Sequence, residues 1–318
     1  SWSGEAIEKV AELMEELKKK VNKMNKMKER KRIKFTKMHG CGNDFIVIDE
    51  HEAEVIPERY KEELSRELCR RKLSIGADGI IFVCKPDPGS GYETQMRIFN
   101  ADGTEAEMSG NGMRCFAKYV YERGLVHGRR MKVKTLGGLV VPEVKDLIDG
   151  RVATVRVFMG KPRFEWLNKP LYVNGIGEIK LTSLSLGNPH AVVILNSFSD
   201  LDVGMAGKSI ETHPAFPNRT NVNFVLLESG DRNRDRNEIT VRTYERGVGE
   251  TLSCGTGSTA SVLALNELGI INASTPVTVH TRGGDLSVEV KEEGAYLTGP
   301  AEEIFEGVFT LQLQLHYD

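Results

Sequence analysis

Several features that would assign a protein to a common class are missing from this sequence of 318 residues. It has no apolar run long enough to cross a bilayer, and no signal peptide is visible. Its 43 Lys and Arg residues are balanced by 45 Asp and Glu residues, which leaves a formal net charge of −2. Because the sequence lacks a basic excess, we expect neither a nucleic acid nor a membrane as its partner.

Cysteine is also scarce. The five cysteines are odd in number and form no Cys-x-x-Cys pair: Cys41, Cys69, Cys84, Cys115 and Cys254. This pattern favours reduced thiols in the cytoplasm over a disulfide framework or a zinc site. We therefore expect a cytoplasmic protein without a bound metal ion, and its length allows two cores of ordinary domain size.

The stretch richest in chemical signals is RTYERGVGETLSCGTG at residues 242–257. It predicts a strand end, a glycine turn that carries Cys254, and a helix of small residues from about Ser258 to Leu268. Backbone N–H groups and a helix dipole at such a position lower a thiol pKa and attract an anion beside it. We therefore expect a lowered pKa for Cys254.

The same arrangement occurs 145 residues earlier in the chain. Four segments match at this spacing: 42–43 with 187–188, 80–83 with 225–227, 97–105 with 242–250, and the turn at Ser109 with the turn at Cys254. Matches over so long a period indicate a duplicated domain rather than a solenoid. Two homologous halves, each with a glycine turn at a helix start, predict one site between them.

Residues 1–30 carry a different pattern. Apolar residues recur there at spacings of three and four, with Lys and Glu between them: Ile7, Val10, Met14, Leu17, Val21 and Met24. This heptad seam predicts a helix. It is either an appended or fused helix, or a coiled-coil or docking helix that sets the oligomeric state, and neither interpretation places chemistry there.

The rest of the chain predicts short strands and few helices. We expect helices over about 57–71 and 112–123, and a strand over 95–100. Short strands at 131–160 favour antiparallel, barrel-like pairing. The alternating run 307–316 predicts a strand that must pair with another part of the chain.

Four motifs together resemble those of the diaminopimelate epimerase family. They are KMHGCGNDF at 37–45, FNADG at 99–103, GNPH at 187–190, and ERG at 245–247 with CGTG at 254–257. Each is weak alone, as short glycine motifs are, but their joint order is specific. The resemblance covers the chain from about Ile33 to its last residue.

The resemblance implies an α/β (α+β) fold of two pseudo-symmetric barrel-like domains. Each domain surrounds a central helix, and the active site lies in the cleft between them. The implied first half is 31–152 plus 301–318, because the last strand returns to it, and the second half is 153–300. The heptad helix at 1–30 is an addition.

The resemblance also implies epimerisation of LL-2,6-diaminopimelate to meso-diaminopimelate, a step of lysine biosynthesis, without pyridoxal phosphate, metal or other cofactor. One cysteine takes the α-proton as a thiolate, and a second returns a proton to the opposite face as a thiol. The substrate carboxylate must meet positive potential as the carbanion forms, which two helix N-termini can supply. We expect a small amino acid as partner, and a homodimer to which the N-terminal helix adds contacts.

The sequence departs from the family at Ser109, where the first catalytic cysteine is expected. A hydroxyl is a far weaker acid than a thiol, so Ser109 can cap a helix but is a poor base. Cys115 lies inside the following helix and does not replace it. We expect impaired turnover, through either an introduced Cys-to-Ser change or a natural single-thiol variant.

The resemblance assigns the remaining site residues. Beside the catalytic pair of Cys254 and Ser109, the substrate-binding positions are Asn43, Asn100, Gly110, Asn111, Asn188, Asn221, Glu245, Arg246, Gly255 and Thr256. Their amides can donate and accept, Arg246 can pair a carboxylate bidentately, and Glu245 can accept from an ammonium. The asparagines are otherwise turn residues, and His190 is either a core histidine or a polar neighbour that tunes Cys254.

Two other functions stay open. A proline or hydroxyproline racemase, or a phenazine-pathway isomerase, would share the fold, but the Asn-Ala-Asp-Gly and Glu-Arg-Gly runs argue against these. A non-catalytic amino-acid-binding or assembly protein is favoured by Ser109 and the heptad helix.

Overall fold

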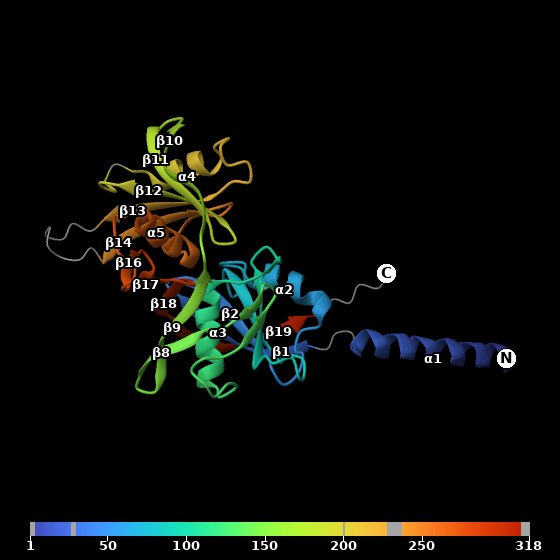
Figure 1. Cartoon of the computed structure of the whole chain (residues 1–318). Helices are drawn as coiled ribbons and strands as arrows, with labels where there is room; N and C mark the ends of the chain where they lie inside the picture. The colour runs from blue at the N-terminus through green and yellow to red at the C-terminus, as the bar shows by residue number, and fades with distance from the viewer. Residues whose placement is uncertain (1–3, 27–29, 200, 228–236, 313–318) are drawn as a thin grey trace. The chain divides into compact units, whose positions relative to one another are not determined.

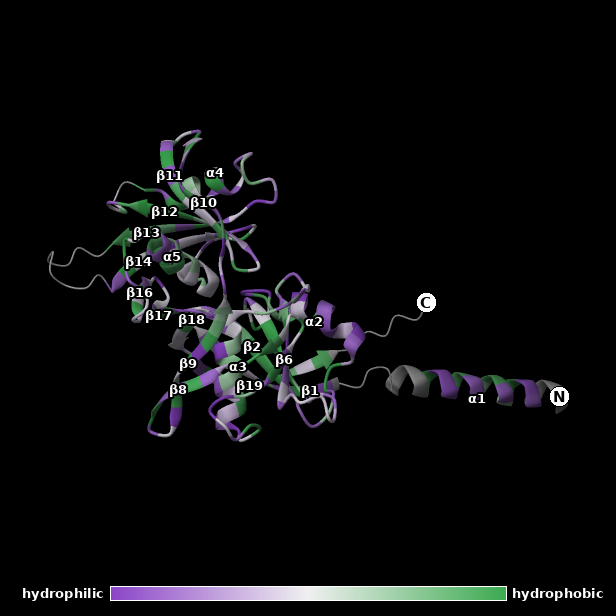
Figure 2. Ribbon diagram, viewed as in Figure 1, coloured by the Kyte–Doolittle hydropathy of each residue, from purple (hydrophilic) through white to green (hydrophobic). Residues whose placement is uncertain are grey.

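The computed structural model describes residues 4–26, 30–199, 201–227 and 237–312. They fall into two compact units, one formed by residues 36–305 and the other by the two ends of the chain. Helix α1 (Gly4–Lys26) in the second unit confirms the helix predicted for the heptad region (Figure 1). Hydrophilic and hydrophobic residues alternate along it (Figure 2).

The first half of the chain forms a sheet with strand order β19-β1-β2-β3-β4-β6-β7, and β5 pairs with β4. The elements in chain order are β1 (Arg30–Gly40), β2 (Asn43–Glu50), η1 (Glu58–Tyr60), α2 (Lys61–Leu68), β3 (Gly79–Cys84), β4 (Thr94–Asn100), β5 (Glu105–Ala106), α3 (Gly110–Glu122), β6 (Val133–Thr135) and β7 (Gly138–Val140). β2 pairs with β3, and β4 with β6, in parallel, so this sheet is mixed rather than purely antiparallel.

The second half forms a larger sheet with strand order β10-β11-β12-β13-β14-β16-β17-β18-β9-β8, and β15 pairs with β14. Its elements are β8 (Glu143–Ile148), β9 (Arg151–Gly160), β10 (Arg163–Val173), β11 (Gly177–Ser185), β12 (Pro189–Leu195), α4 (Val203–Glu211), β13 (Asn221–Leu227), β14 (Glu238–Glu245), β15 (Gly249–Thr251), α5 (Gly255–Glu267), β16 (Val277–Thr281), β17 (Gly284–Lys291) and β18 (Gly294–Pro300). Helix α4 matches α2 in chain order, and β19 (Glu302–Gln312) follows β18.

The predicted repeat is visible in both sheets, where β1-β2-β3-β4-β6-β7 corresponds to β11-β12-β13-β14-β16-β17. The same ion pair recurs at the same place: Arg97 Nε donates to Glu105 Oε1 at 2.8 Å, and Arg242 Nε donates to Glu250 Oε1 at 2.8 Å. The spacing of 145 is not kept in every strand, however. Arg97 pairs with Phe82 and Arg242 with Phe224, so β3 and β13 correspond at a spacing of 142. The predicted match of 80–83 with 225–227 is therefore wrong by three residues, because the second half is shorter before β13.

Each half buries a central helix, as predicted. Phe116 in α3 and Leu265 in α5 are fully buried, and both belong to one continuous apolar cluster. Helix α5 lies among β12, β13 and β14 (Figure 1). Its small residues explain how it packs closely, since Thr259 and Ser261 satisfy their buried hydroxyls on backbone oxygens four residues earlier. A helix buried on most sides is a core helix rather than an amphipathic surface helix.

Two predicted boundaries need correction. Helix α5 begins at Gly255, three residues before Ser258, because Cys254 itself caps it. Strand β19 begins at Glu302 rather than 307, and residues 313–316 of the predicted strand lie outside the described residues. The domain boundaries proposed from the sequence stay a prediction.

Candidate functional site

Equivalent turns cap the N-termini of α3 and α5. Ser109 Oγ accepts a hydrogen bond from Gly112 N at 3.1 Å, and Cys254 Sγ accepts one from Gly257 N at 3.3 Å. Both capping residues have extended backbone, with φ −140° and ψ 125° for Ser109 and φ −129° and ψ 116° for Cys254. This is the usual N-cap geometry. The duplicated backbone therefore holds a hydroxyl in one half where it holds a thiol in the other.

The first turns of α3 and α5 meet. A Cβ on Gly255 would lie 3.6 Å from Asn111 Oδ1 and 4.0 Å from the Cα of Gly110. The predicted residues Gly110, Asn111 and Gly255 are therefore close together, and the absent side chain at Gly255 permits this approach. Two helix N-termini directed at one place create positive potential there, which suits a carboxylate.

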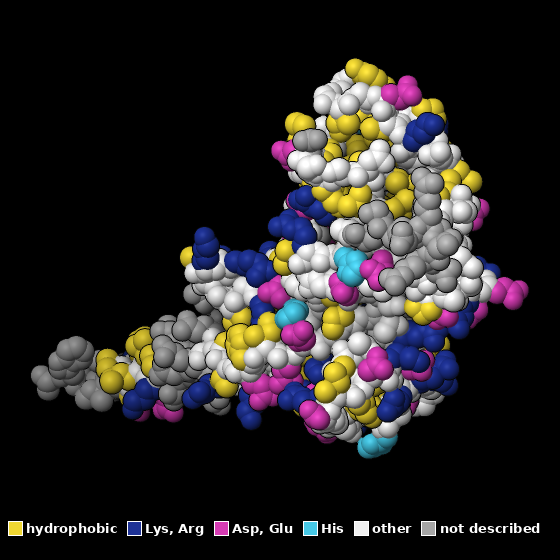
Figure 3. All heavy atoms as spheres, turned by 90° about the vertical axis from the view of Figure 1, so that its left-hand side faces the viewer, with side chains coloured by type: hydrophobic (Ala, Val, Ile, Leu, Met, Phe, Trp, Pro, Cys, Tyr) yellow, Lys and Arg dark blue, Asp and Glu magenta, His cyan; other side chains and the backbone are white. Residues whose placement is uncertain are grey.

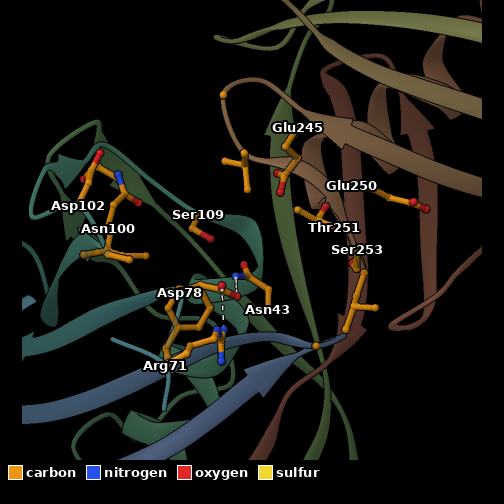
Figure 4. A pocket seen from close by; sticks show the side chains of 18 of the residues that line it. Asn43, Arg71, Asp78, Asn100, Asp102, Ser109, Glu245, Glu250, Thr251 and Ser253 are labelled. Atoms are coloured by element: carbon orange, nitrogen blue, oxygen red, sulfur yellow. Dashed lines mark hydrogen bonds and ion pairs between the residues drawn. The ribbon is translucent and has the colours of Figure 1, made fainter. Parts of the chain in front are cut away.

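A cavity of about 900 Å³ lies beside the turn of Ser109 and receives residues from both halves (Figure 4). Four predicted residues line it: Asn43, Asn100, Ser109 and Glu245. Its other polar lining residues include Arg71, Asp78 and Asp102 from the first half and Glu250, Thr251 and Ser253 from the second. Figure 4 shows Ser109 and Glu245 on opposite walls, so the two halves share this cavity.

The other predicted residues do not line this cavity. They are Gly110, Asn111, Asn188, His190, Asn221, Arg246, Cys254, Gly255 and Thr256. Cys254 is only 6% exposed. The structure thus gathers both glycine turns at one place, but it presents the hydroxyl, and not the thiol, to the open cavity.

The surroundings of Cys254 correct one prediction. Burial raises the pKa of the Cys254 thiol, and the Glu245 carboxylate raises it further. The Thr256 hydroxyl and the Gly257 N–H lower this pKa by less. The predicted lowering is therefore wrong, because desolvation of the thiolate beside a carboxylate outweighs the helix N-terminus. Burial also raises the pKa of the Glu245 carboxyl.

Asn43 is held between two neighbours. Its Nδ2 donates to Asp78 Oδ2 at 2.7 Å, and its Oδ1 accepts from Asn111 Nδ2 at 3.1 Å. Asp78 also accepts from Arg71 at 3.0 Å (Figure 4). A carboxylate only accepts hydrogen bonds, so Asp78 fixes the orientation of the Asn43 amide, and Asn43 fixes that of Asn111. Asn111 Oδ1 is buried and has no partner among the described residues.

His190 is fully buried in β12. Burial lowers the pKa of His190 to about 3, and the Arg246 guanidinium contributes to this, so the ring is neutral at pH 7. Its Nε2 lies 3.1 Å from Asn188 Oδ1, and Asn188 Nδ2 donates to Thr256 Oγ1 at 3.3 Å. His190 is thus a core histidine that is also joined, through its neighbours, to the Cys254 turn.

The remaining amides are engaged with nearby groups. Asn221 Nδ2 donates to Pro189 O at 2.9 Å, and its Oδ1 accepts from Arg246 N at 2.9 Å. The Arg246 guanidinium donates to the backbone oxygen of Asn218 at 3.2 Å. Asn100 Nδ2 donates to Thr104 Oγ1 at 3.0 Å.

Sequence reasoning missed four charged residues of the cavity wall: Arg71, Asp78, Asp102 and Glu250. Asp78 stands in the run Gly76-Ala77-Asp78-Gly79, whose glycines are typical of a turn, and Asp102 lies inside the FNADG motif that carries the resemblance. The place of each aspartate in its motif is the sequence feature that could have identified it as a residue of the cavity wall. Arg71 follows α2 with no local pattern, and only the fold brings it to Asp44 and Asp78.

Neither a metal site nor a spanning helix was found in the part of the chain that the structure describes. It contains no group of three His, Cys, Asp or Glu side chains placed to hold a metal ion. None of its helices has the length and apolar character needed to cross a membrane. On the face drawn in Figure 3, Lys and Arg side chains are interspersed with Asp and Glu.

Solved structures define the class of fold. A hydroxyproline epimerase from Agrobacterium vitis matches with a TM-score of 0.67 at 15% identity, covering 89% of this chain and 94% of that one. A phenazine biosynthesis protein from Bacillus anthracis matches with a TM-score of 0.66 at 15% identity, covering 88% and 99%. The chain therefore has the two-halved fold that these proteins share.

Sequence comparison gives the family. The family model for diaminopimelate epimerase matches residues 35–165 and 182–304. A diaminopimelate epimerase from Methanothermobacter thermautotrophicus is 45% identical over 292 residues, which cover 87% of this chain and 98% of the relative. One from Methanocaldococcus jannaschii is 43% identical over 299 residues, covering 86% and 97%. The chain belongs to the diaminopimelate epimerase family, and α1 precedes the part matched by the family model.

Proposed function

We propose that this chain is an isomerase of lysine biosynthesis of the type that epimerises LL-2,6-diaminopimelate to meso-diaminopimelate, and that Ser109 impairs the inversion step here. The observation that carries this proposal is the meeting of the N-termini of α3 and α5 behind the Ser109 and Cys254 turns. We place the activity in the cytoplasm, where a free thiol such as Cys254 stays reduced.

The proposed chemistry begins at Cys254. Its thiolate removes the α-proton, so an S–H bond forms as the C–H bond breaks, and the electron pair spreads from the α-carbon into the carboxylate. Backbone N–H groups of the two turns, at Gly110 and Gly255, donate to that carboxylate as its charge grows. A proton returned to the opposite face then completes the inversion.

The second face is where this chain differs from a two-thiol site. Ser109 holds the equivalent turn, and its hydroxyl is a poor proton donor and acceptor at neutral pH. The unmodified chain can therefore remove an α-proton and return one from solvent to the same face through Cys254. The result is exchange of the α-hydrogen without inversion.

The distal head of the substrate needs a second set of partners. We assign it to Asn100, Asn188 and Asn221 together with Arg246, the predicted residue able to pair a second carboxylate bidentately. The side chain of Arg246 is free to exchange its single backbone contact at Asn218 for a carboxylate. Glu245, half-buried at the cavity wall, would accept from an ammonium group.

Calorimetry on the chain as it stands tests the substrate. We expect diaminopimelate to bind at least about 100-fold more tightly than lysine or alanine, since unmatched buried polar groups penalise the shorter ligands. Arg246→Lys should remove most of this preference, because lysine offers a point charge instead of a fork. Equal affinity for lysine and diaminopimelate would contradict the substrate assignment. Binding with no α-hydrogen exchange would instead support the non-catalytic alternative.

We also propose that the chain forms a homodimer and that α1 adds contacts to it. Its apolar seam is exposed, with Val10 at 47% and Leu17 at 55%. Residues 5–16 carry five Glu and one Lys, whereas residues 17–26 carry five Lys and no acid. Antiparallel pairing of two α1 helices would bury the seam and place the acidic part of each against the basic part of the other.

Light scattering of the full chain tests this pairing. We expect Met14→Glu with Leu17→Glu to lower the measured mass, because charges would enter the seam, while Glu12→Gln outside the seam leaves the mass unchanged. An unchanged mass for the double variant would show that α1 does not join two copies.

A further inference from the structure

A series of buried hydrogen bonds starts in the core of the second half and is directed toward Cys254. Thr243 Oγ1 in β14 donates to Asn223 Oδ1 in β13 at 2.9 Å. Asn223 Nδ2 lies 3.1 Å from His190 Nδ1 and 3.4 Å from the backbone oxygen of Ala191. Thr243, Asn223 and His190 are each at most 4% exposed. Buried polar side chains in series are costly unless every one is satisfied, and these are.

The series continues to the sulfur. His190 Nε2 lies 3.1 Å from Asn188 Oδ1, and Asn188 Nδ2 donates to Thr256 Oγ1 at 3.3 Å. Thr256 Oγ1 in turn lies 3.5 Å from Cys254 Sγ. We call this series, from Thr243 through Asn223, His190, Asn188 and Thr256 to Cys254, the thiol relay.

The direction of the first links follows from one fixed acceptor. The Ala191 carbonyl can only accept, so the group of Asn223 that faces it is the NH₂. The same NH₂ faces His190 Nδ1, which therefore accepts. A neutral imidazole that accepts at Nδ1 carries its proton on Nε2.

The later links follow in the same direction. The Nε2–H of His190 donates to Asn188 Oδ1, which leaves the Asn188 NH₂ to donate to Thr256. Thr256 Oγ1 has then accepted a hydrogen bond, and its own hydrogen is free to point at Cys254 Sγ. A donor at the sulfur stabilises the thiolate more than the thiol.

Among the residues that the structure describes, no such series lies behind Ser109 in the first half. The paired residues Asn223 and Thr243 in β13 and β14 correspond in register to Ile81 and Ile98 in β3 and β4. Apolar side chains therefore fill the place that polar ones occupy behind Cys254. The polar pair is found in the half that holds the thiol, and the apolar pair in the half that holds the hydroxyl.

We propose that Asn223 is a positioning residue for Cys254: it holds His190 as the Nε2–H tautomer, and so makes every link of the thiol relay donate toward the sulfur. This inference rests on the proposed function, in which Cys254 is the base. Asn223 does not line the cavity, and the hydrogen-bond partners of the sulfur are Thr256 and Gly257, so we expect Asn223 to act through His190, Asn188 and Thr256.

Two charged groups lie beside the relay, and they have opposite consequences for the thiolate at its end. Glu245, at the end of β14, raises the pKa of Cys254. Arg246 lowers the pKa of His190 and helps to keep the ring neutral. Helix α5, which begins at the sulfur, carries no charged side chain before its last residue, Glu267. The relay therefore supplies a side-chain hydrogen bond that stabilises the Cys254 thiolate, whereas burial and the Glu245 carboxylate destabilise it.

Asn223→Asp tests the direction of the relay with almost no change of shape. A carboxylate at 223 accepts from His190 Nδ1–H, so Nε2 becomes an acceptor and the Asn188 amide must turn. The Thr256 hydrogen then points at Asn188 instead of Cys254. We expect the pH at which α-deuterium exchange of diaminopimelate is half-maximal to rise by about one unit, with at least about a tenfold loss of rate at neutral pH.

Asn223→Leu tests the same link without a new charge. It removes the donor to His190 Nδ1, so we expect a rise in the same half-maximal pH and a ring no longer fixed as one tautomer, which ¹⁵N spectra of the His190 ring report without substrate. Ser261→Ala is the matched control, because it removes a buried hydroxyl of α5 that donates to Gly257 O and is not part of the thiol relay. Its pH profile should match that of the parent.

The outcomes separate the inference from the proposed function. If the parent exchanges hydrogen and both Asn223 variants keep its pH profile and its His190 tautomer, the inference is overturned. If the parent shows no exchange, the proposed function fails, while the ring spectra still decide whether Asn223 sets the tautomer.

Discussion

The two halves of this chain share one backbone plan and differ in how their hydrogen bonds point. In the first half, Asn111 donates to Asn43, because Asp78 occupies the Asn43 NH₂. In the second half the equivalent pair is reversed, and Asn188 donates to Thr256. In the first turn, the acceptor Asn111 Oδ1 therefore has no partner among the described residues. In the second turn, Thr256 Oγ1 receives a hydrogen bond from the Asn188 amide.

This difference teaches that a duplicated fold need not duplicate its chemistry. Phe45 and His190 hold the same position in β2 and β12, each beside the parallel strand β3 or β13. This buried ring is the apolar one of Phe45 in the half that holds Ser109, and the polar one of His190 in the half that holds Cys254. The second half therefore places a polar side chain at a position where the first half places an apolar one.

Placing a thiol in the first turn should remove the difference between the two halves, and we expect it to have the largest effect of the three changes. We expect Ser109→Cys to raise interconversion of LL- and meso-diaminopimelate by about 10²- to 10⁴-fold, the usual contribution of a positioned acid or base. Chiral chromatography of the two isomers measures this. Adding Cys254→Ser to that variant should abolish the gain, whereas Cys84→Ser should not. An unmodified chain already as fast as Ser109→Cys would refute the two-thiol account.

Equivalent glycines offer a second contrast. A Cβ on Gly257 would lie 2.3 Å from Asn223 Oδ1 and 3.0 Å from Thr243 Oγ1, which are buried and hydrogen-bonded. On Gly112 it would lie 3.0 Å from Ile98 Cδ1, the end of a flexible side chain. We expect Gly257→Ala to lower the free energy of unfolding by about 2–3 kcal/mol, and Gly112→Ala to change it by less than about 1 kcal/mol.

Urea denaturation of both glycine variants measures this contrast. Equal losses of stability would mean that the polar core behind the Cys254 turn is no more tightly packed than the apolar core behind Ser109.

Acid stability gives the smallest of the three effects when it is compared over a single pH unit. The pKa of His190 is lowered from 6.5 to about 3 in the folded chain, so the unfolded chain binds a proton there that the folded chain does not. Stability is therefore lost as the pH falls from about 6.5 toward 3, by up to about 1.4 kcal/mol per pH unit. His190→Gln should flatten that slope. The control is His127→Gln, at an exposed histidine of the first half.

Unfolding free energies across that pH range provide the measurement. If both histidine variants keep the slope of the parent, His190 does not carry the acid sensitivity of the second half.

The fold was largely predictable from the sequence, because its main signals are local or periodic. The matching glycine turns predicted two halves, each with a central helix, and extended backbone at Ser109 and Cys254 follows from the N-cap pattern. The heptad spacing predicted α1. The sequence did not predict the shift of three residues before β13, because short apolar runs match at more than one offset.

The electrostatics of the site could not be predicted in the same way. A turn at a helix start indicates a lowered thiol pKa, but the burial and the Glu245 carboxylate that raise the pKa of Cys254 arise only from packing. The contact of Asn43 with Asp78 joins residues 35 apart, and that of Asn223 with His190 joins residues 33 apart. No local pattern encodes such contacts.

The central claim is that one thiol, at Cys254, acts alone on one face of the substrate. Incubating the unmodified chain with LL- and meso-diaminopimelate in D₂O tests it most directly, with mass spectrometry after chiral separation. The account predicts deuterium at α-carbons of one configuration only, with that configuration retained. Deuterium at centres of both configurations, or inversion at a rate comparable to exchange, would contradict it.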